Sequence, residues 1–304
     1  MISRRSFLRT GSLLTLGAAA SSYVDLPKRK PVGVQLYTVR DAMSRDVAGT
    51  LTRVAATGFS YVEGATYSGT QQFYGMTPKA FAAALAAAGL TMPSNHYRWG
   101  FDVPKGATDG GTVDSGTPVR GTIRNGWEKA VADAREVGVR YMVLAWLSET
   151  ERSSLDNYRR LAADLNVAGK TCADAGIQLC YHNHDFEFAP IDGQVPYDLL
   201  LRDTDPALVK MELDLYWTTK AGQDPVALFG KHPGRFPLWH VKDMDATPQQ
   251  HFTEVGNGVI DFRRIFRARE TAGMQHFFVE QDSTPGDPFD SIRESYRYVR
   301  RKLV

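Results

Sequence analysis

The stretch YHNHDFEF (181–188) ends an apolar run in polar side chains, and the same pattern recurs in MELDLYW (211–217), LWHVKD (238–243) and FFVEQD (277–282). Successive side chains of a β-strand point to opposite faces, so residues of one parity share a face. The even-numbered polar residues of these segments include His182, His184, Glu212, Asp214, His240, Lys242 and Glu280. If the four strands are parallel neighbours, imidazole and carboxylate groups converge on one point. Such groups suit divalent ions such as Mn, Fe, Co or Zn, so the pattern predicts a metal site.

The remainder of the chain alternates between strand and helix patterns. Buried strands are expected at 32–39, 61–65, 91–97 and 140–146, ahead of the four segments above. Helices are expected at 47–57, 78–88, 127–137, 153–175, 197–201, 225–229, 262–272 and 289–301. Eight strands and eight helices without a linker-like composition predict a single-domain (β/α)8 TIM barrel over residues 31–304. A doubly wound sheet would need a glycine fingerprint after its first strand, and VGVQLYTVRD has none.

Polar and aromatic residues also end the first four expected strands. These residues are Tyr37, Glu63, His96 and Trp146. The active site of a (β/α)8 barrel lies at the carboxyl ends of its strands, so polar and aromatic residues at these positions agree with the predicted barrel. Residues 98–120 are rich in Gly, Asp, Thr and Pro and have no periodicity, which predicts a loop insertion of the kind that is often functional.

The first residues indicate export. SRRSFL (3–8) places two adjacent arginines ahead of a mildly apolar stretch, and Ala18, Ala19 and Ala20 supply small residues for cleavage. This pattern is typical of a twin-arginine signal peptide over residues 1–20, followed by a linker at 21–30. We therefore expect the twin-arginine export machinery as a partner and a periplasmic or secreted protein. The apolar stretch is shorter than the roughly 20 residues that span a bilayer, so no stable membrane anchor is expected.

Charge and cysteine content narrow the function classes. The chain has 36 Lys and Arg against 34 Asp and Glu, and the expected signal contains three arginines and no acid, so the rest carries a formal charge of −1. No basic patch points to nucleic acid.

Cys172 and Cys180 are the two cysteines, and they form neither a CxxC nor a zinc-knuckle spacing. In an oxidising compartment they could pair, or they could remain buried thiols.

The order YHNH, ELDLYW, WHVKD, GNGVIDF and FVEQD resembles the xylose-isomerase-like barrel superfamily of sugar isomerases and epimerases, which includes inosose dehydratases. The resemblance covers roughly residues 31–302. It implies one divalent metal, held by the residues that end strands five to eight. By motif these are His182, Asp214, His240 and Glu280, and the ion would be Mn, Co, Zn, Mg or Fe.

One departure from the family pattern affects the expected reaction. Family epimerases usually carry Glu at the strand-five position, and this Glu works with the strand-eight Glu on opposite faces of one carbon. Here YHNH (181–184) stands where those enzymes read a YENH-like sequence. A neutral imidazole can bind a metal and act as a base near pH 7. It cannot reproduce a symmetric exchange between two carboxylates, so simple epimerisation is disfavoured.

The resemblance also implies roles for single residues. Glu280 or His182 would act as the base, and Lys242 or His184 would assist the oxyanion. The expected substrate-binding residues, chosen by their position near strand ends, are His184, His96, Glu187 and Trp217.

Two residues keep alternative interpretations. Glu212 either accepts an N–H from a metal ligand or lies one layer deeper as a structural group. Lys242 either holds a substrate oxygen by its charge or pairs with Glu212 or Asp214.

These observations predict a metal-dependent sugar isomerase/epimerase-like enzyme that acts on a non-phosphorylated sugar or keto-sugar through an enediolate. Loss of a β-oxygen from the same intermediate would make it a lyase or dehydratase that acts on a 3-keto-glycoside or an inosose. A non-catalytic periplasmic sugar-binding protein is the alternative from another class, and the four competent metal ligands argue against it. An endonuclease-like phosphodiesterase would need more metal ligands and a basic groove, and neither is evident.

Overall fold

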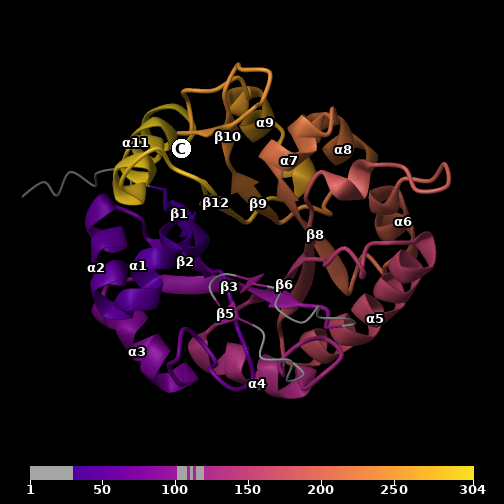
Figure 1. Ribbon diagram of the computed structural model, residues 1–304, viewed down its shortest axis with the longest axis horizontal. Helices are drawn as coiled ribbons and strands as arrows, with labels where there is room; N and C mark the ends of the chain where they lie inside the picture. Colours follow the sequence, from indigo (N-terminus) through magenta and orange to yellow (C-terminus); the bar gives the residue numbers. More distant parts are fainter. Residues whose placement is uncertain (1–29, 101–107, 110–111, 114–119) are drawn as a thin grey trace, which may run out of the picture. The chain divides into compact units, whose positions relative to one another are not determined.

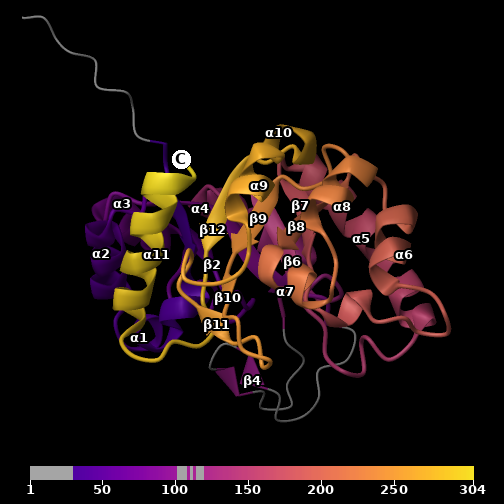
Figure 2. The same cartoon turned by 90° about the horizontal axis from the view of Figure 1, so that it is seen from above.

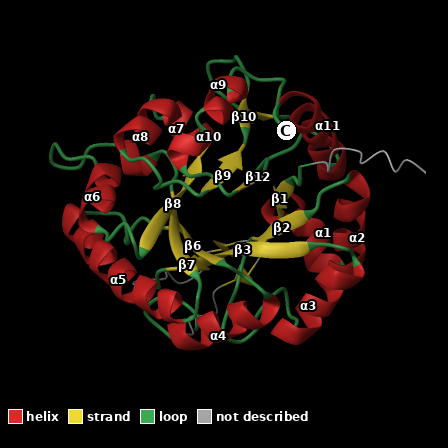
Figure 3. Cartoon of the chain, turned by 180° about the vertical axis from the view of Figure 1, so that it is seen from behind, coloured by secondary structure: helices red, strands yellow, loops and turns green. Residues whose placement is uncertain are grey.

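Eight parallel strands close into a barrel in the computed structural model, which describes residues 30–100, 108–109, 112–113 and 120–304. The barrel strands are β1 Gly33–Gln35, β2 Tyr61–Gly64, β3 Thr91–Arg98, β6 Tyr141–Trp146, β7 Gln178–His182, β8 Val209–Asp214, β9 Leu238–Val241 and β12 His276–Val279. Their order around the barrel is β1-β12-β9-β8-β7-β6-β3-β2. Helices surround the strands on all sides (Figures 1 and 3). The predicted (β/α)8 fold is therefore confirmed.

Helices follow the strands along the chain. They are α1 Arg40–Arg45, α2 Val47–Thr57, α3 Pro78–Ala87, α4 Trp127–Val137, α5 Leu155–Asp174, α6 Pro196–Asp203, α7 Leu215–Lys220, α8 Pro225–Lys231, α9 Phe262–Arg267, α10 Arg269–Ala272 and α11 Pro288–Lys302. Short 3-10 turns occur at Leu36–Val39 and Phe186–Phe188. Two-stranded ribbons pair β4 Thr108–Asp109 with β5 Thr112–Val113, and β10 Asp243–Met244 with β11 Phe252–Thr253. The second ribbon follows the carboxyl end of β9 and lies at that end of the barrel (Figure 2).

Several predicted strands end earlier than expected, and in two of them a polar side chain starts a helical turn. Gln35 accepts a hydrogen bond from the Tyr37 N–H at 3.1 Å, and β1 ends there instead of at Val39. Asp214 accepts one from the Trp217 N–H at 2.9 Å, so β8 ends there and α7 begins. Such a side chain satisfies a free N–H in the first helical turn. The prediction of strand at residues 36–39 and 215–217 was therefore wrong.

Other expectations fall partly or wholly outside the described residues. The expected signal peptide (1–20) lies outside them, as does the linker (21–30) apart from Lys30. Most of the expected loop insertion (98–120) also lies outside them. Residues 31–304 form one compact unit. Within the described part of the chain, no helix is long and apolar enough to cross a bilayer.

The interior of the barrel is apolar at one end and polar at the other. Tyr61, Val143, Cys180, Leu238 and Phe278 form a separate buried cluster, which we call the apolar floor. Four of the five side chains two residues further along the chain share this face and are polar, namely Glu63, His182, His240 and Glu280, and the fifth is Ala145. Cys180 and Cys172 are both buried free thiols.

Strand register sets the spacing of the polar layers above the apolar floor. His182 lies opposite Glu212 on the neighbouring strand, and Asp214 lies opposite His240. Four polar residues from three adjacent strands are therefore brought together at the carboxyl end of the barrel.

Candidate metal and substrate site

A cavity of about 310 Å³ opens at the carboxyl ends of the strands. Its lining residues are Tyr37, Ala65, Thr66, Tyr67, His96, Tyr97, Arg98, Ala145, Trp146, His182, His184, Lys242, Glu280 and Asp282. The volume lies at the lower end of the range for small-molecule sites, which is about 300 to 1,000 Å³. Charged, imidazole and aromatic side chains share the wall, so the cavity suits a small polar molecule.

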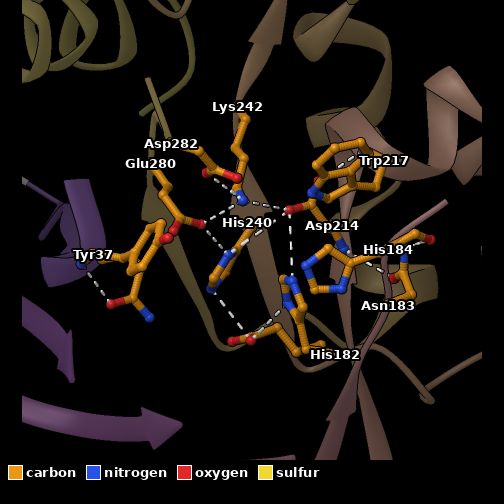
Figure 4. Close-up of polar contacts among 12 residues, drawn as sticks. Tyr37, His182, Asn183, His184, Asp214, Trp217, His240, Lys242, Glu280 and Asp282 are labelled. Carbon is orange, nitrogen blue, oxygen red and sulfur yellow. Dashed lines mark hydrogen bonds and ion pairs between the residues drawn. The ribbon is translucent and has the colours of Figure 1, made fainter. Parts of the chain in front are cut away.

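The four predicted metal ligands meet beside this cavity. His182 Nε2 lies 3.8 Å from Asp214 Oδ2, and His240 Nδ1 lies 3.9 Å from the same oxygen. His240 Nδ1 is also 2.6 Å from Glu280 Oε2. Figure 4 shows these four side chains pointing toward one another, three from β7, β8 and β9 and Glu280 from the position directly after β12. We call His182, Asp214, His240 and Glu280 the upper cluster.

The backbone fixes which oxygen of Asp214 faces this cluster. Oδ1 of Asp214 accepts the Trp217 N–H, and the Asp214 N–H donates to Asn183 Oδ1 at 3.1 Å. Oδ2 of Asp214, Nδ1 of His240 and Oε2 of Glu280 are buried and have no hydrogen bond of normal geometry among the described residues. These atoms are instead engaged by charge, since Lys242 Nζ lies 3.1 Å from Asp214 Oδ2 and 2.8 Å from Glu280 Oε2, a place that an ion could take. Two carboxylates and two imidazoles fit a divalent cation there.

Lys242 contacts three carboxylates at the edge of the upper cluster. Its Nζ lies 3.1 Å from Asp214 Oδ2, 2.8 Å from Glu280 Oε2 and 2.8 Å from Asp282 Oδ1. Of the two pairings left open by the sequence, the structure shows the one with Asp214. Burial lowers the pKa of Lys242, but the three carboxylates outweigh this effect and raise it well above its usual range. Lys242 is therefore a fixed cation in the cavity wall.

A second layer of polar groups lies beneath the upper cluster. This layer consists of Glu63, His96 and Glu212, which we call the lower cluster, and its two carboxylates face the other ring nitrogens of the two upper histidines. His182 Nδ1 is 3.1 Å from Glu212 Oε2, and His240 Nε2 is 2.5 Å from Glu63 Oε2. His96 Nε2 lies 3.0 Å from Glu212 Oε2 and 3.2 Å from Glu63 Oε2. Glu212 therefore agrees with both interpretations from the sequence, since it lies one layer below the upper cluster and also faces a ring nitrogen of the predicted ligand His182.

Charges in the two clusters set the protonation states of the acidic groups. Burial raises the pKa of Glu280, but the charges of Lys242 and His240 outweigh this and lower it to about 2. Burial raises the pKa of Asp214 to about 6 against the opposing effect of the same two residues. Burial likewise raises the pKa of Glu63, yet His96 and His240 hold it well below its usual range. Glu280 and Glu63 are therefore ionised at neutral pH.

The imidazoles divide into charged and neutral groups. Burial lowers the pKa of His96, but Glu63 and Glu212 more than compensate and raise it to about 9. Burial lowers the pKa of His184 to about 3, and the charge of Lys242 adds to this effect. Burial and the neighbouring imidazoles hold the pKa of His182 well below its usual range. His182 and His184 are therefore neutral and each has a free lone pair.

Comparison with known proteins agrees with this barrel. Residues 51–302 match the family of the xylose isomerase-like TIM barrel. The chain belongs to this family. The family resemblance predicted from the motifs is thus confirmed.

Individual relatives in the family are isomerases, epimerases and dehydratases. An inosose dehydratase of Geobacillus thermodenitrificans is 30% identical over 155 residues, which are 45% of this chain and 51% of that protein. The chain thus spans about half the length of the curated relatives it matches. A sugar phosphate isomerase/epimerase from Parabacteroides distasonis is 27% identical in its crystal structure, with a TM-score of 0.73 over 93% of this chain and 97% of that one.

A more distant structure shows the fold alone. An L-ribulose 3-epimerase is 16% identical with a TM-score of 0.63, and the match covers 90% of this chain and 94% of that chain. The common architecture of the xylose isomerase-like barrel therefore persists where little sequence identity remains.

The four expected substrate-binding residues lie in different environments within this xylose isomerase-like barrel. His184 lines the cavity, with its ring stacked on Phe186 at 5.3 Å and its Nδ1 without a hydrogen-bond partner among the described residues. His96 lines the cavity but turns Nε2 toward the lower cluster. Trp217 contacts the His184 ring at 5.6 Å and is not among the cavity-lining residues. It therefore supports His184 from behind.

Glu187 lies away from the cavity. It is fully buried, accepts a hydrogen bond from the Tyr181 hydroxyl at 2.7 Å and accepts another from the His184 N–H at 2.8 Å. The chain leaves the strand after His182 and turns at Phe186–Phe188, so parity no longer predicts the direction of its side chains. This position does not fit the substrate-facing role expected for Glu187, which instead holds the His184 backbone.

Sequence reasoning missed three groups of the site. Asp282 pairs with Lys242, Glu63 pairs with His240, and Gln35 donates to Glu63 at 2.8 Å. Asp282 has the same parity as Glu280 in FFVEQD, and this signal was available in the sequence. Glu63 was noted as a strand-end residue, but nothing in the local sequence indicates that it contacts a histidine 177 positions away.

Proposed function

We propose that this protein is a divalent-metal-dependent enzyme that removes a proton next to the carbonyl of a non-phosphorylated sugar or keto-sugar, as isomerases and epimerases do. The observation that carries the proposal is the upper cluster, in which two imidazoles and two carboxylates meet beside a cavity. His182, Asp214, His240 and Glu280 would hold Mn, Co, Zn, Mg or Fe. Such an ion supplies a Lewis acid that polarises a carbonyl and stabilises negative charge on its oxygen.

Glu280 is the best placed base. It lines the cavity, and its pKa of about 2 keeps it ionised at neutral pH. A carboxylate of such low basicity takes a carbon-bound proton only where the product anion is strongly stabilised. Lys242 supplies part of this stabilisation, because it also lines the cavity and its ammonium group lies 2.8 Å from Glu280. His184 offers a neutral nitrogen to a substrate hydroxyl.

The sugar assignment rests on the wall of the cavity and on the relatives. Tyr37 and Trp146 present aromatic surface beside charged groups, an arrangement that suits a ring with one apolar face and several hydroxyls. The matched relatives are named for sugar phosphates and an inosose. A non-phosphorylated substrate is favoured because the expected signal directs the protein to a compartment poor in sugar phosphates.

A lyase reaction is the second candidate. The carboxylates in the cavity wall, Glu280 and Asp282, both lie in the segment that follows β12. Strand five contributes His182 where family epimerases have Glu. Acid and base groups that lie on one side of the bound substrate favour a reaction at one face of it, such as loss of a β-oxygen. Inversion of a carbon would need groups on both faces. Lys242, as a fixed cation, would stabilise the negative charge on the leaving oxygen, and the proton that Glu280 removes from carbon would be returned to that oxygen. The name of the inosose dehydratase relative supports a keto-glycoside or an inosose as substrate.

The decisive experiment follows proton exchange. Purified protein would be assayed for bound metal, then incubated in D2O with ketoses, inososes and 3-keto-glycosides, with and without EDTA, and analysed by NMR. We expect deuterium at the carbon next to the carbonyl, and no exchange after EDTA treatment. A protein that binds these sugars without any exchange would be a sugar-binding protein instead. The products distinguish isomerisation from elimination.

We also propose that the protein is exported by the twin-arginine machinery. The support is the segment SRRSFL (3–8) and the small residues at 18–20. This route carries folded proteins, so the barrel would acquire its metal before export. The proposed location is the periplasm or the exterior of the cell.

A further inference from the structure

The two histidines of the upper cluster use their two ring nitrogens in opposite ways. His182 directs Nε2 to the upper cluster and Nδ1 to Glu212. His240 directs Nδ1 to the upper cluster and Nε2 to Glu63. An imidazole that binds a metal through one nitrogen keeps one N–H on the other, so each metal-bound ring must place its proton on one of the two sides.

The lower carboxylates decide on which side the proton lies. An ionised carboxylate only accepts hydrogen bonds, so the nitrogen that faces it must be the donor. Glu212 Oε2 is 3.1 Å from His182 Nδ1, and Glu63 Oε2 is 2.5 Å from His240 Nε2. The free lone pair of His182 is then on Nε2, which faces the upper cluster. His240 also has a carboxylate on its upper side, since Nδ1 lies 2.6 Å from Glu280 Oε2. An ion bound in the upper cluster would take the place of a proton on Nδ1 and leave the N–H of His240 on Nε2, facing Glu63.

The lower carboxylates are themselves held firmly. Glu63 and Glu212 are fully buried. Glu63 accepts hydrogen bonds from Gln35 Nε2 at 2.8 Å and from the Ser94 hydroxyl. His96 Nε2 lies within 3.2 Å of both carboxylates and supplies positive charge between them. Glu63 is thus fixed before any ion arrives, whereas Glu212 is held through Oε2 and its Oε1 has no hydrogen-bond partner among the described residues.

We propose that Glu63 and Glu212 are positioning residues that impose opposite tautomers on the two metal-binding histidines, so that His182 binds through Nε2 and His240 through Nδ1. The proposal rests on the proposed metal-dependent function and adds how its ligand set is prepared. Carboxylate partners of this kind orient a metal-bound imidazole and raise its basicity. The lower cluster is therefore a clamp for the ligands of the upper cluster.

The competing interpretation is a second ion in the lower cluster. His96, His182, Glu212 and His240 each offer an atom, and these atoms lie within 4.8 Å of one another. Two ions that share His182 and His240 would require a lone pair on both nitrogens of both rings. A neutral imidazole has one lone pair, so two imidazolates would be needed. One ion in the upper cluster avoids this requirement.

The first test reads the tautomers directly. Full-length protein with 15N-labelled histidine would be loaded with Zn²⁺, and long-range 1H–15N NMR would assign the protonated nitrogen of each ring. We expect the proton on Nδ1 of His182 and on Nε2 of His240. Identical tautomers at the two residues would overturn the clamp, and so would a protein that binds two equivalents of Zn²⁺.

The second test uses metal affinity as its readout. Glu212→Gln and Glu63→Gln are each expected to weaken Zn²⁺ binding about 10- to 100-fold in a calorimetric titration. Glu187→Gln is the matched control, because Glu187 is an equally buried carboxylate that contacts neither metal-binding histidine. If both lower-cluster variants bind Zn²⁺ with unchanged affinity, the positioning role of Glu63 and Glu212 is wrong, while the proposed metal-dependent function stands. Failure of the wild type to bind any divalent metal overturns the proposed function together with the clamp.

Discussion

Replacement of Lys242 by Met is expected to tighten divalent-metal binding and to slow catalysis. The ammonium group of Lys242 lies 3.1 Å from Asp214 Oδ2 and 2.8 Å from Glu280 Oε2, the two oxygens proposed to bind the metal. A cation at this place neutralises the same carboxylates that an ion would neutralise, so the two compete. Met keeps much of the side-chain volume and removes the charge.

The geometry sets the size of the effect. Loss of one partner from a buried charge pair typically costs about 3 to 5 kcal/mol, because the other charge is left uncompensated. For a domain of this size, about 3 kcal/mol lowers the melting temperature of the metal-free protein by roughly 5 to 10 °C. Metal binding restores the balance at Asp214 and Glu280 but leaves Asp282 without its partner. We therefore expect metal affinity to rise at least about 10-fold, which corresponds to roughly 1.4 kcal/mol.

Thermal unfolding with and without Mn²⁺, together with calorimetric titration, measures both effects in one protein. Lys210→Met is the control, since Lys210 lies near the start of β8 and donates to the Gly234 carbonyl at 3.0 Å, away from the upper cluster. At saturating metal, turnover of Lys242→Met should fall about 100-fold if the ammonium group stabilises the oxyanion. Metal affinity that stays the same or weakens would refute the competition between Lys242 and the ion.

Further predictions concern single side chains. Asp214→Asn should abolish metal binding, measured by metal analysis, while circular dichroism shows an intact barrel, because the amide oxygen can still cap α7. Glu280→Gln should lower turnover about 100-fold or more with a smaller change in substrate affinity, and nearly intact turnover would remove Glu280 as the base. Burial raises the pKa of Glu187 from 4.5 to about 7. The free energy of unfolding should therefore fall by on the order of 3 kcal/mol as the pH rises from 4.5 to 7. In Glu187→Gln, the melting temperature should depend less on pH over this range. Replacement of Arg4 and Arg5 by Lys should leave the precursor in the cytoplasm, and fractionation that finds it exported would contradict the signal assignment.

Parity along single strands was the most informative feature of the sequence. It brought His182, Asp214, His240 and Glu280 to one face, and the structure places their side chains within a few ångströms of one another. Period two is a property of any regular strand, so it needs no knowledge of the neighbouring strands. Parity stops where the strand stops, so it gives no direction for Glu187, which was chosen only by its position beyond the end of β7 and which the structure places away from the cavity.

Contacts between distant strands were the part that the sequence could not reveal. Glu63 lies on β2 and meets His240 on β9 only because the barrel is closed and small enough for side chains to meet across its centre. Which nitrogen of His240 faces which carboxylate depends on the ring rotamer and on the stagger of the strands. A pattern of residue types contains neither quantity.

The apolar floor has a consequence for the fate of isotopic label. Tyr61, Val143, Cys180, Leu238 and Phe278 fill the barrel beneath the polar layers, so this packed layer gives water no polar path from below. A hydrogen that Glu280 removes from a bound sugar can then be exchanged only through the mouth of the cavity, which the sugar itself occupies. A tritium or deuterium atom carried by the substrate would therefore partly return to the same molecule, and the fraction returned would measure how long the mouth stays blocked during one turnover.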